Sequence, residues 1–153
     1  MSGDSGPDGL LRDKVHSLNV RVYHEDTDVT GVVYHASYLR FLERGRSDFL
    51  RAIGVTHALL RDGPSPMAFA VRRMAIEFMK PARLEDLLTV RSVFAPLQGA
   101  RLHLFQTIEK TGQTLLYAEL DVACVALDGR AMRPPKVLVN AIAPYQGGVL
   151  NST

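Results

Sequence analysis

The sequence predicts an α+β protein in which one long helix packs against an antiparallel sheet of five to six strands. Apolar residues at helical spacing form one long stripe over about residues 33–53. Runs in which apolar and polar residues alternate, as in half-buried strands, occur once before this stripe and four times after it. Because a sheet must bury its apolar face, the long helix is its expected partner.

The length and composition predict a single domain. We expect a flexible leader over residues 1–13, the folded domain over residues 14–143 and a flexible tail over residues 144–153. The 18 basic and 16 acidic residues are too balanced to indicate nucleic acid as a partner. No apolar run approaches the roughly 20 residues of a membrane span, and the leader lacks the apolar centre of a signal peptide.

The cysteine and histidine content adds two expectations. The single cysteine, Cys124, excludes an internal disulfide and favours a cytoplasmic location. The five histidines lack the spacing of metal ligands, so no metal site is expected. Cys124 is expected in the core. His16, His57 and His103 have no partner in sequence and are expected to be structural or on the surface.

The first two elements are a strand over residues 15–23 and the long helix. The helix is expected to run from residue 33 or 35 to residue 53, with Gly54 as its C-terminal cap. Gly45 inside the helix costs about 1 kcal/mol relative to alanine, which predicts a close approach to another element. Four charged residues are expected to face outward: Arg40, Arg44, Asp48 and Arg51.

Four more strands and a short helix are predicted in the second half of the chain. A loop rich in glycine and proline at residues 61–66 precedes them. The short helix is expected over residues 136–143. The strands are predicted over residues 67–79, 87–94, 101–109 and 114–127.

Groups suited to chemistry converge on the loop before the long helix. Glu25, Asp26 and Asp28 crowd the approach to the helix, and Gly31 supplies the backbone freedom of a tight turn. A helix start carries unpaired N–H groups and a partial positive charge, so it can stabilise a developing oxyanion. A carboxylate there can act as a base or a nucleophile. We expect Asp26 to be structural and paired with an arginine, and a second carboxylate to raise the pKa of Asp28.

The residues around this loop resemble a known family. Residues 21–38 read Arg-Val-Tyr-His-Glu-Asp-Thr-Asp-x-x-Gly-Val-Val-Tyr-His-x-x-Tyr, and residues 41–46 read Phe-Leu-Glu-Arg-Gly-Arg. This string resembles the hotdog-fold acyl-CoA thioesterases of the 4-hydroxybenzoyl-CoA thioesterase type, in particular the Tol–Pal-associated, YbgC-like branch. The resemblance covers about residues 15–140 and includes Phe-Ala-Val-Arg-Arg-Met at residues 69–74.

The resemblance implies a hotdog fold, a homodimer that assembles further into a tetramer, and active sites at the subunit interface. The implied substrate is a thioester of coenzyme A or of acyl carrier protein, hydrolysed to free acid and thiol without a cofactor. Asp28 occupies the family's catalytic carboxylate position and acts either as a nucleophile or as a base that activates water. The backbone N–H of His35 is implied to polarise the thioester carbonyl, and such a donor is worth about 10²–10³ in rate.

Other residues are assigned to substrate binding, each beside a plainer interpretation. The His35 side chain can orient substrate, Tyr34 and Tyr38 line the acyl pocket or belong to the core, and Glu43 reaches the pocket or pairs with a base. Basic residues near the site are expected to meet the phosphates of coenzyme A, although ordinary solvated charges explain them equally well. The predicted binding residues are Gly31, Val33, Tyr34, Tyr38, Glu43, Arg72, Arg73 and Lys80.

Two other functions compete with hydrolysis. A hotdog hydratase or dehydratase usually carries a histidine in the turn–helix region, so the Asp-x-x-Gly-Val-Val turn at residues 28–33 favours the thioesterase. A non-catalytic acyl-CoA-binding module would normally carry an effector domain, for which the leader is too short. The acyl chain stays open, because pocket depth depends on the packing of Leu39, Leu42 and Arg46.

Overall fold

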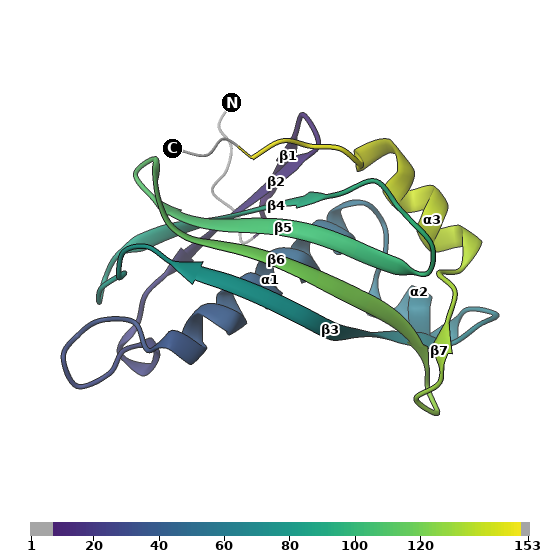
Figure 1. Ribbon diagram of the computed structural model, residues 1–153, viewed down its shortest axis with the longest axis horizontal. Helices are drawn as coiled ribbons and strands as arrows, with labels where there is room; N and C mark the ends of the chain where they lie inside the picture. The colour runs from purple at the N-terminus through teal and green to yellow at the C-terminus, as the bar shows by residue number, and fades with distance from the viewer. Residues whose placement is uncertain (1–7, 151–153) are drawn as a thin grey trace.

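The computed structural model describes residues 8–150, in which a seven-stranded antiparallel sheet curves over one long helix (Figure 1). The strand order is β1-β2-β4-β5-β6-β3, and β7 pairs with β6. The strands are β1 (Leu10–Arg12), β2 (Val15–Arg21), β3 (Met67–Phe78), β4 (Leu87–Phe94), β5 (Arg101–Lys110), β6 (Gln113–Ala126) and β7 (Ala131–Met132). The helices are α1 (His35–Ala52), α2 (His57–Asp62) and α3 (Lys136–Ile142), with 3-10 turns η1 (His24–Asp26) and η2 (Ala143–Tyr145).

The α+β class is confirmed, and the predicted strands and helices end within one or two residues of the observed bounds. The predicted strand count is wrong, because the short strands β1 and β7 extend the sheet to seven. Neither they nor α2 carries a periodic pattern long enough to be recognised in the sequence.

Both expected flexible ends are partly ordered. β1 lies inside the expected leader and pairs with β2, so residues 10–12 belong to the sheet. In the expected tail, the N–H of Gly147 donates to the carbonyl of Phe94 at 2.8 Å. The remaining parts of these predictions, residues 1–7 and 151–153, lie outside the described residues.

The core consists of two apolar clusters along α1. One surrounds Phe41 and Leu42, and the other surrounds Phe49. Between them α1 comes close to the sheet at Gly45, where a Cβ atom would lie 2.6 Å from Val90 Cγ1. The predicted close approach at this glycine is therefore confirmed. Cys124 lies in the second cluster, as predicted, and burial raises its pKa to about 11.

One face of α1 departs from the prediction. Asp48 was expected to face outward, but only 4% of its side chain is exposed. Its Oδ2 atom lies 2.7 Å from Nε2 of His16, which is completely buried, and accepts a hydrogen bond from the N–H of Gly9 at 2.8 Å. This contact joins α1 to β2 and to the segment before β1, which the spacing of residues along the helix does not reveal.

Among residues 8–150, none of the helices has the length and apolar character that crossing a membrane requires.

Candidate active site

The loop between β2 and α1 folds into a tight turn that presents Asp28. The N–H of Gly31 donates to the Asp28 carbonyl at 3.2 Å, and the N–H of Asp28 donates to the carbonyl of Val32 at 2.9 Å. Gly31 adopts a φ of +85°, which a side chain would disfavour. The Asp28 carboxylate is exposed and accepts hydrogen bonds from the N–H and hydroxyl of Thr30 at 2.8 and 2.6 Å.

Backbone hydrogen bonds fix this turn beside the start of α1. The N–H of Tyr34 donates to the carbonyl of Asp26 at 2.9 Å, and the N–H of Val33 donates to the carbonyl of Ala82 at 2.8 Å. Residues directly before α1 are therefore tied both to η1 and to the connection between β3 and β4. The turn that carries Asp28 is held close to His35, the first residue of the helix.

The two aspartates of the loop have different environments. Asp26 is buried, accepts a hydrogen bond from the N–H of Tyr23 at 2.9 Å and lies 3.7 Å from Arg40. Its predicted structural role and arginine partner are confirmed. The hydrogen bonds from Thr30 lower the pKa of Asp28, so the expectation that a neighbouring carboxylate raises this pKa is wrong.

The start of α1 can accept an anionic or polar group. Tyr34 occupies the N-cap position, and its side chain makes no capping hydrogen bond. The N–H of Ser37 donates to the carbonyl of Tyr34 at 2.8 Å, so the N–H groups of His35 and Ala36 retain their capacity for an outside acceptor. The side chains of Tyr34 and His35 are both exposed, and the centroids of their rings lie 4.5 Å apart.

Two residues assigned to substrate binding lie in the core instead. The Tyr38 side chain is buried, its hydroxyl accepts a hydrogen bond from the N–H of Ala82 at 2.9 Å, and burial raises its pKa. Val33 is buried in the same cluster. The plainer interpretation of Tyr38 thus holds, because apolar residues at the helix start face the sheet. Leu42 is also completely buried in this cluster.

The basic residues predicted to bind coenzyme A lie in different parts of the fold relative to the turn that carries Asp28. Arg72 and Arg73 are exposed in the middle of β3, where Arg73 pairs in register with Asp121 of β6. Lys80 is exposed just after β3. Arg83 lies nearer the turn, because its backbone forms a bridge with Val32. The connection between β3 and β4 therefore brings Arg83 beside the turn that carries Asp28.

A small pocket of about 120 Å³ lies between α1 and the sheet. Glu43, Arg46, Ser47 and Leu50 line it from α1, and apolar residues of β3, β4, β5 and β6 line the rest. Glu43 is exposed, whereas Arg46 is partly buried and donates to Oε1 of Gln106 at 3.1 Å. The contact of Arg46 with Gln106 was not predicted. The signal for it was a glutamine on the apolar face of a strand, in line with Leu102, Leu104 and Ile108.

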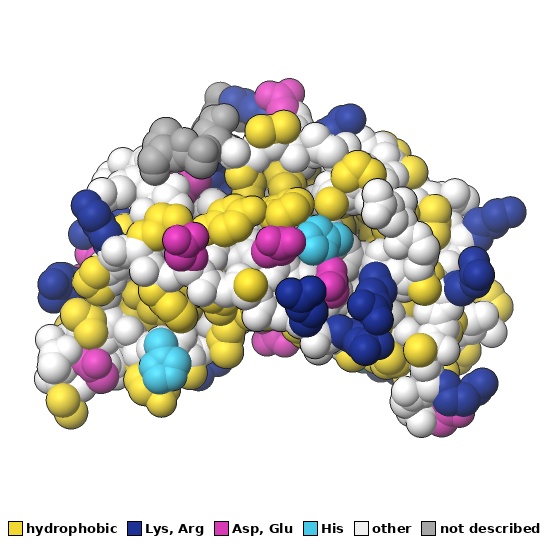
Figure 2. Space-filling view, in the orientation of Figure 1, with side chains coloured by type: hydrophobic (Ala, Val, Ile, Leu, Met, Phe, Trp, Pro, Cys, Tyr) yellow, Lys and Arg dark blue, Asp and Glu magenta, His cyan; other side chains and the backbone are white. Residues whose placement is uncertain are grey.

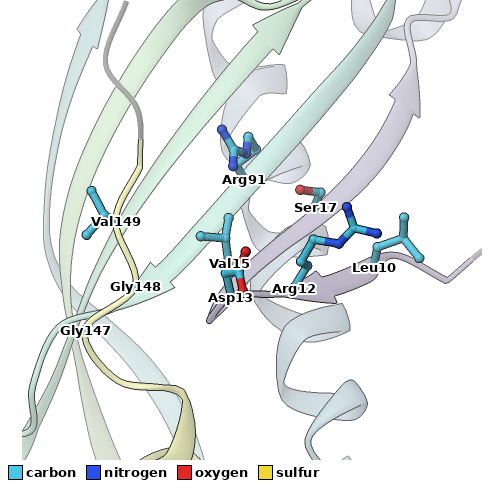
Figure 3. Close-up of a pocket in the computed structure, with 9 residues that line it drawn as sticks. All are labelled: Leu10, Arg12, Asp13, Val15, Ser17, Arg91, Gly147, Gly148 and Val149. Carbon is cyan, nitrogen blue, oxygen red and sulfur yellow. The ribbon is translucent and has the colours of Figure 1, made fainter.

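A larger hollow of about 480 Å³ lies at the opposite edge of the sheet, between β1, β2, β4 and the chain end (Figure 3). It contains none of the predicted site residues. Its Arg91 side chain already lies 3.5 Å from Glu109. This hollow lacks a carboxylate at a helix start and is not the candidate active site.

The outer face of the sheet carries a cluster of charged side chains (Figure 2). His103 contacts Asp121 through Nδ1 and lies 3.0 Å from Glu119 through Nε2. His103 therefore has two partners that its sequence neighbours do not reveal, because they lie across the strand pair β5–β6. Within residues 8–150, no three or more metal-ligating side chains lie close enough to hold a metal ion.

These features define a class of protein. A strongly curved antiparallel sheet around α1, with a carboxylate in the turn before that helix, is the arrangement of a hotdog-fold thioesterase-like protein. The thioesterase-like superfamily matches residues 22–142, and the chain belongs to this family.

Several relatives share most of the chain. It is 39% identical over 127 residues to the acyl-CoA thioester hydrolase YbgC of Escherichia coli O6:H1, which covers 83% of this chain and 92% of that protein. It is 41% identical over 117 residues to the acyl-CoA thioesterase YbgC of Haemophilus influenzae, covering 76% and 85%. The crystal structure of a probable thioesterase from Bartonella henselae matches with a TM-score of 0.76 and 42% identity, covering 79% and 99%.

Proposed function

We propose that the protein hydrolyses acyl thioesters of coenzyme A to a free acid and a thiol. The observation that carries this proposal is the exposed Asp28 carboxylate, held in a tight turn directly before the uncapped start of α1. A nucleophile or base and an oxyanion donor are thereby brought together, as acyl transfer requires. Relatives that match 39% and 41% of the aligned residues are named acyl-CoA thioesterases, which favours coenzyme A over a carrier protein.

In the proposed reaction the thioester carbonyl oxygen accepts a hydrogen bond from the N–H of His35. An Asp28 oxygen attacks the carbonyl carbon, the C–S bond breaks, and the thiolate of coenzyme A leaves and takes up a proton. Water then hydrolyses the acyl–aspartyl anhydride to the free acid and restores Asp28. The hydrogen bonds from Thr30 lower the pKa of Asp28, so its carboxylate is ionised near neutral pH, as both nucleophilic attack and base catalysis require.

Basic side chains near the turn are suited to the phosphates of coenzyme A. Lys80 and Arg83 lie in the connection whose backbone is tied to the Asp28 turn, so we assign them to phosphate binding. Arg72 and Arg73 lie in the middle of β3, away from this connection. We assign them to phosphate binding only at the site of a second subunit. Gly31 contributes by shaping the turn, while Tyr34 and Glu43 are exposed where substrate can contact them.

We also propose that two chains pair through β3. This strand of 12 residues forms an edge of the sheet, and edge strands of this length are usually covered. Val71 and Phe78 on it are 47% and 53% exposed. A partner strand would cover them and bring Arg72 and Arg73 towards the other subunit's site. Sedimentation at several protein concentrations tests this: a monomer at all of them contradicts it, and a tetramer shows a second interface.

The test of the function is thiol release from a panel of acyl-CoA thioesters. The native protein is compared with Asp28→Asn and with Asp128→Asn, a matched control. Asp128 is likewise exposed in a turn and accepts a hydrogen bond from the N–H two residues later, at 3.1 Å from Arg130. We expect hydrolysis of some member, a loss of about 10²-fold or more in Asp28→Asn and no loss in Asp128→Asn.

Two results would count against the proposal. Equal, slow release by the native protein and by Asp28→Asn would remove the catalytic role of Asp28. Binding of acyl-CoA without any turnover would leave a non-catalytic acyl-CoA-binding module. Trapping of an acyl–aspartyl intermediate with hydroxylamine separates nucleophilic attack from base catalysis.

A further inference from the structure

The small pocket under α1 is apolar on its sheet side and has its polar residues on the side of α1. Phe69, Phe94, Leu102, Leu104 and Val122 supply apolar walls from four strands of the sheet. Its volume of about 120 Å³ is that of about four water-sized groups. The pocket therefore suits the last few atoms of an acyl chain rather than a whole long chain or a large ring.

Arg46 is one of the polar residues on the α1 side of the pocket, and the core holds it in place. Nη1 of Arg46 donates to Oε1 of Gln106 at 3.1 Å. Gln106 is completely buried, and its Nε2 donates to the carbonyl of Leu42 at 3.0 Å and to Oγ of Ser92 at 2.8 Å. Because both N–H groups of this amide are used, its oxygen is left to face Arg46.

This network depends on how near α1 comes to the sheet. A Cβ atom on Gly45 would lie 2.6 Å from Val90 Cγ1 and 3.3 Å from Nε2 of Gln106. Only glycine lets the helix come close enough for Gln106 to reach the carbonyl of Leu42. The residue next to Arg46 thus sets the depth at which the guanidinium group lies.

Arg46 has donors and charge to spare. A guanidinium group has five N–H donors, and one hydrogen bond to a neutral amide is found for Arg46 within residues 8–150. No carboxylate of the described chain lies within ion-pair distance of it. Glu43, one turn earlier, attracts it and also lines the pocket, but its side chain is exposed. Burial lowers the pKa of Arg46, so an anion entering the pocket would relieve an unfavourable charge.

We propose that Arg46 is a specificity-determining residue that binds a carboxylate at the far end of the acyl group. This rests on the proposed thioesterase function and names the substrate class as ω-carboxyacyl thioesters. Arginine pairs with a carboxylate through two parallel hydrogen bonds, which Lys cannot reproduce. Arg46 lies 11 residues after His35, about 16 Å along α1, so within one subunit the acyl chain has roughly a dozen bonds.

The experiment uses pairs of acyl-CoA thioesters that differ only in a terminal carboxylate or methyl group, at chain lengths from short to long. The kcat and KM of hydrolysis are measured for the native protein, Arg46→Met and Arg46→Lys. Arg44→Met is the matched control, because it removes the same charge two residues before Arg46. The Arg44 side chain packs over Phe41 and is not among the residues that line the pocket. Thermal unfolding establishes that each variant is folded.

We expect the native protein to prefer the carboxylate member of at least one pair by about tenfold or more in kcat/KM. Arg46→Met loses this preference through KM and keeps its activity on the methyl member, Arg46→Lys keeps part of it, and Arg44→Met keeps all of it. Equal hydrolysis of both members at every length overturns the proposal and leaves the thioesterase function intact. So does a loss in Arg46→Met that is equal for both members. No hydrolysis of any member overturns the function and this proposal together.

Discussion

Replacing Asp48 by alanine removes an acceptor that joins α1 to the start of the chain. The carboxylate accepts hydrogen bonds from the N–H of Gly9 at 2.8 Å, from Nε2 of His16 at 2.7 Å and from Arg51. His16 is completely buried and stacks on Phe49, so water cannot replace the lost partner. The substitution leaves a polar ring nitrogen and a backbone N–H without an acceptor in the protein.

The expected loss of stability is about 3 kcal/mol. Because burial lowers the pKa of His16, its ring is neutral at neutral pH and the loss is that of a buried hydrogen bond; a buried donor left without its acceptor costs about 1–3 kcal/mol. The upper end applies here, because the N–H of Gly9 loses its acceptor as well. The contact with Arg51 adds little, since 57% of that side chain is exposed. Arg51→Ala is therefore the matched control and is expected to cost under about 1 kcal/mol.

Urea denaturation followed by circular dichroism, at one fixed protein concentration, measures both variants. With a slope of about 2 kcal/mol per molar, Asp48→Ala is expected to lower the urea midpoint by about 1.5 M. A decrease under about 0.5 M, or an equal decrease in Arg51→Ala, would refute the reasoning that the buried contact with His16 carries the energy.

Three further predictions follow from single residues. Burial lowers the pKa of His16 below its ordinary 6.5, so the imidazole binds a proton more readily in the unfolded chain than in the folded one. The contribution of His16 to the free energy of unfolding is therefore full above pH 6.5 and decreases as the pH falls below it. Urea titrations at several pH values should show that His16→Phe removes this pH dependence. Gly45→Ala crowds Val90, which costs about 1–3 kcal/mol, whereas the gain in helix propensity is about 1 kcal/mol. Thermal unfolding should therefore show a net loss of stability, and adding Val90→Ala should reduce this loss. A Gly45→Ala variant more stable than the native protein would contradict the close approach. Burial raises the pKa of Cys124 to about 11, so a thiol reagent at neutral pH should leave the folded protein unmodified, and rapid labelling without denaturant would contradict its place in the core.

Periodic patterns determined most of the fold. The alternation in β2, β4, β5 and β6 and the apolar stripe of α1 set strand and helix bounds to within one or two residues, because these elements have one buried face. Gly45 was read correctly as a close approach, since glycine inside a helix is unfavourable unless space requires it. The structural role predicted for Asp26 is confirmed by its burial and by its contacts with Tyr23 and Arg40 in the same part of the chain.

Short or two-sided elements were not predictable in this way. β1, β7 and α2 are held by their neighbours rather than by a pattern of their own.

The residues of the candidate site likewise divide into those that the sequence could place and those that it could not. The sequence by itself placed Asp28, Gly31 and the start of α1 together, since they are close along the chain.

Only the tertiary structure decided which side chains far apart in sequence meet. It paired Asp48 with His16, placed the Tyr38 hydroxyl against Ala82, and set Arg46 against Gln106. The physical reason is that local spacing fixes which face of an element a residue occupies. The partner on that face, and hence the charge and hydrogen bonds of the residue, depends on how the sheet curves over α1.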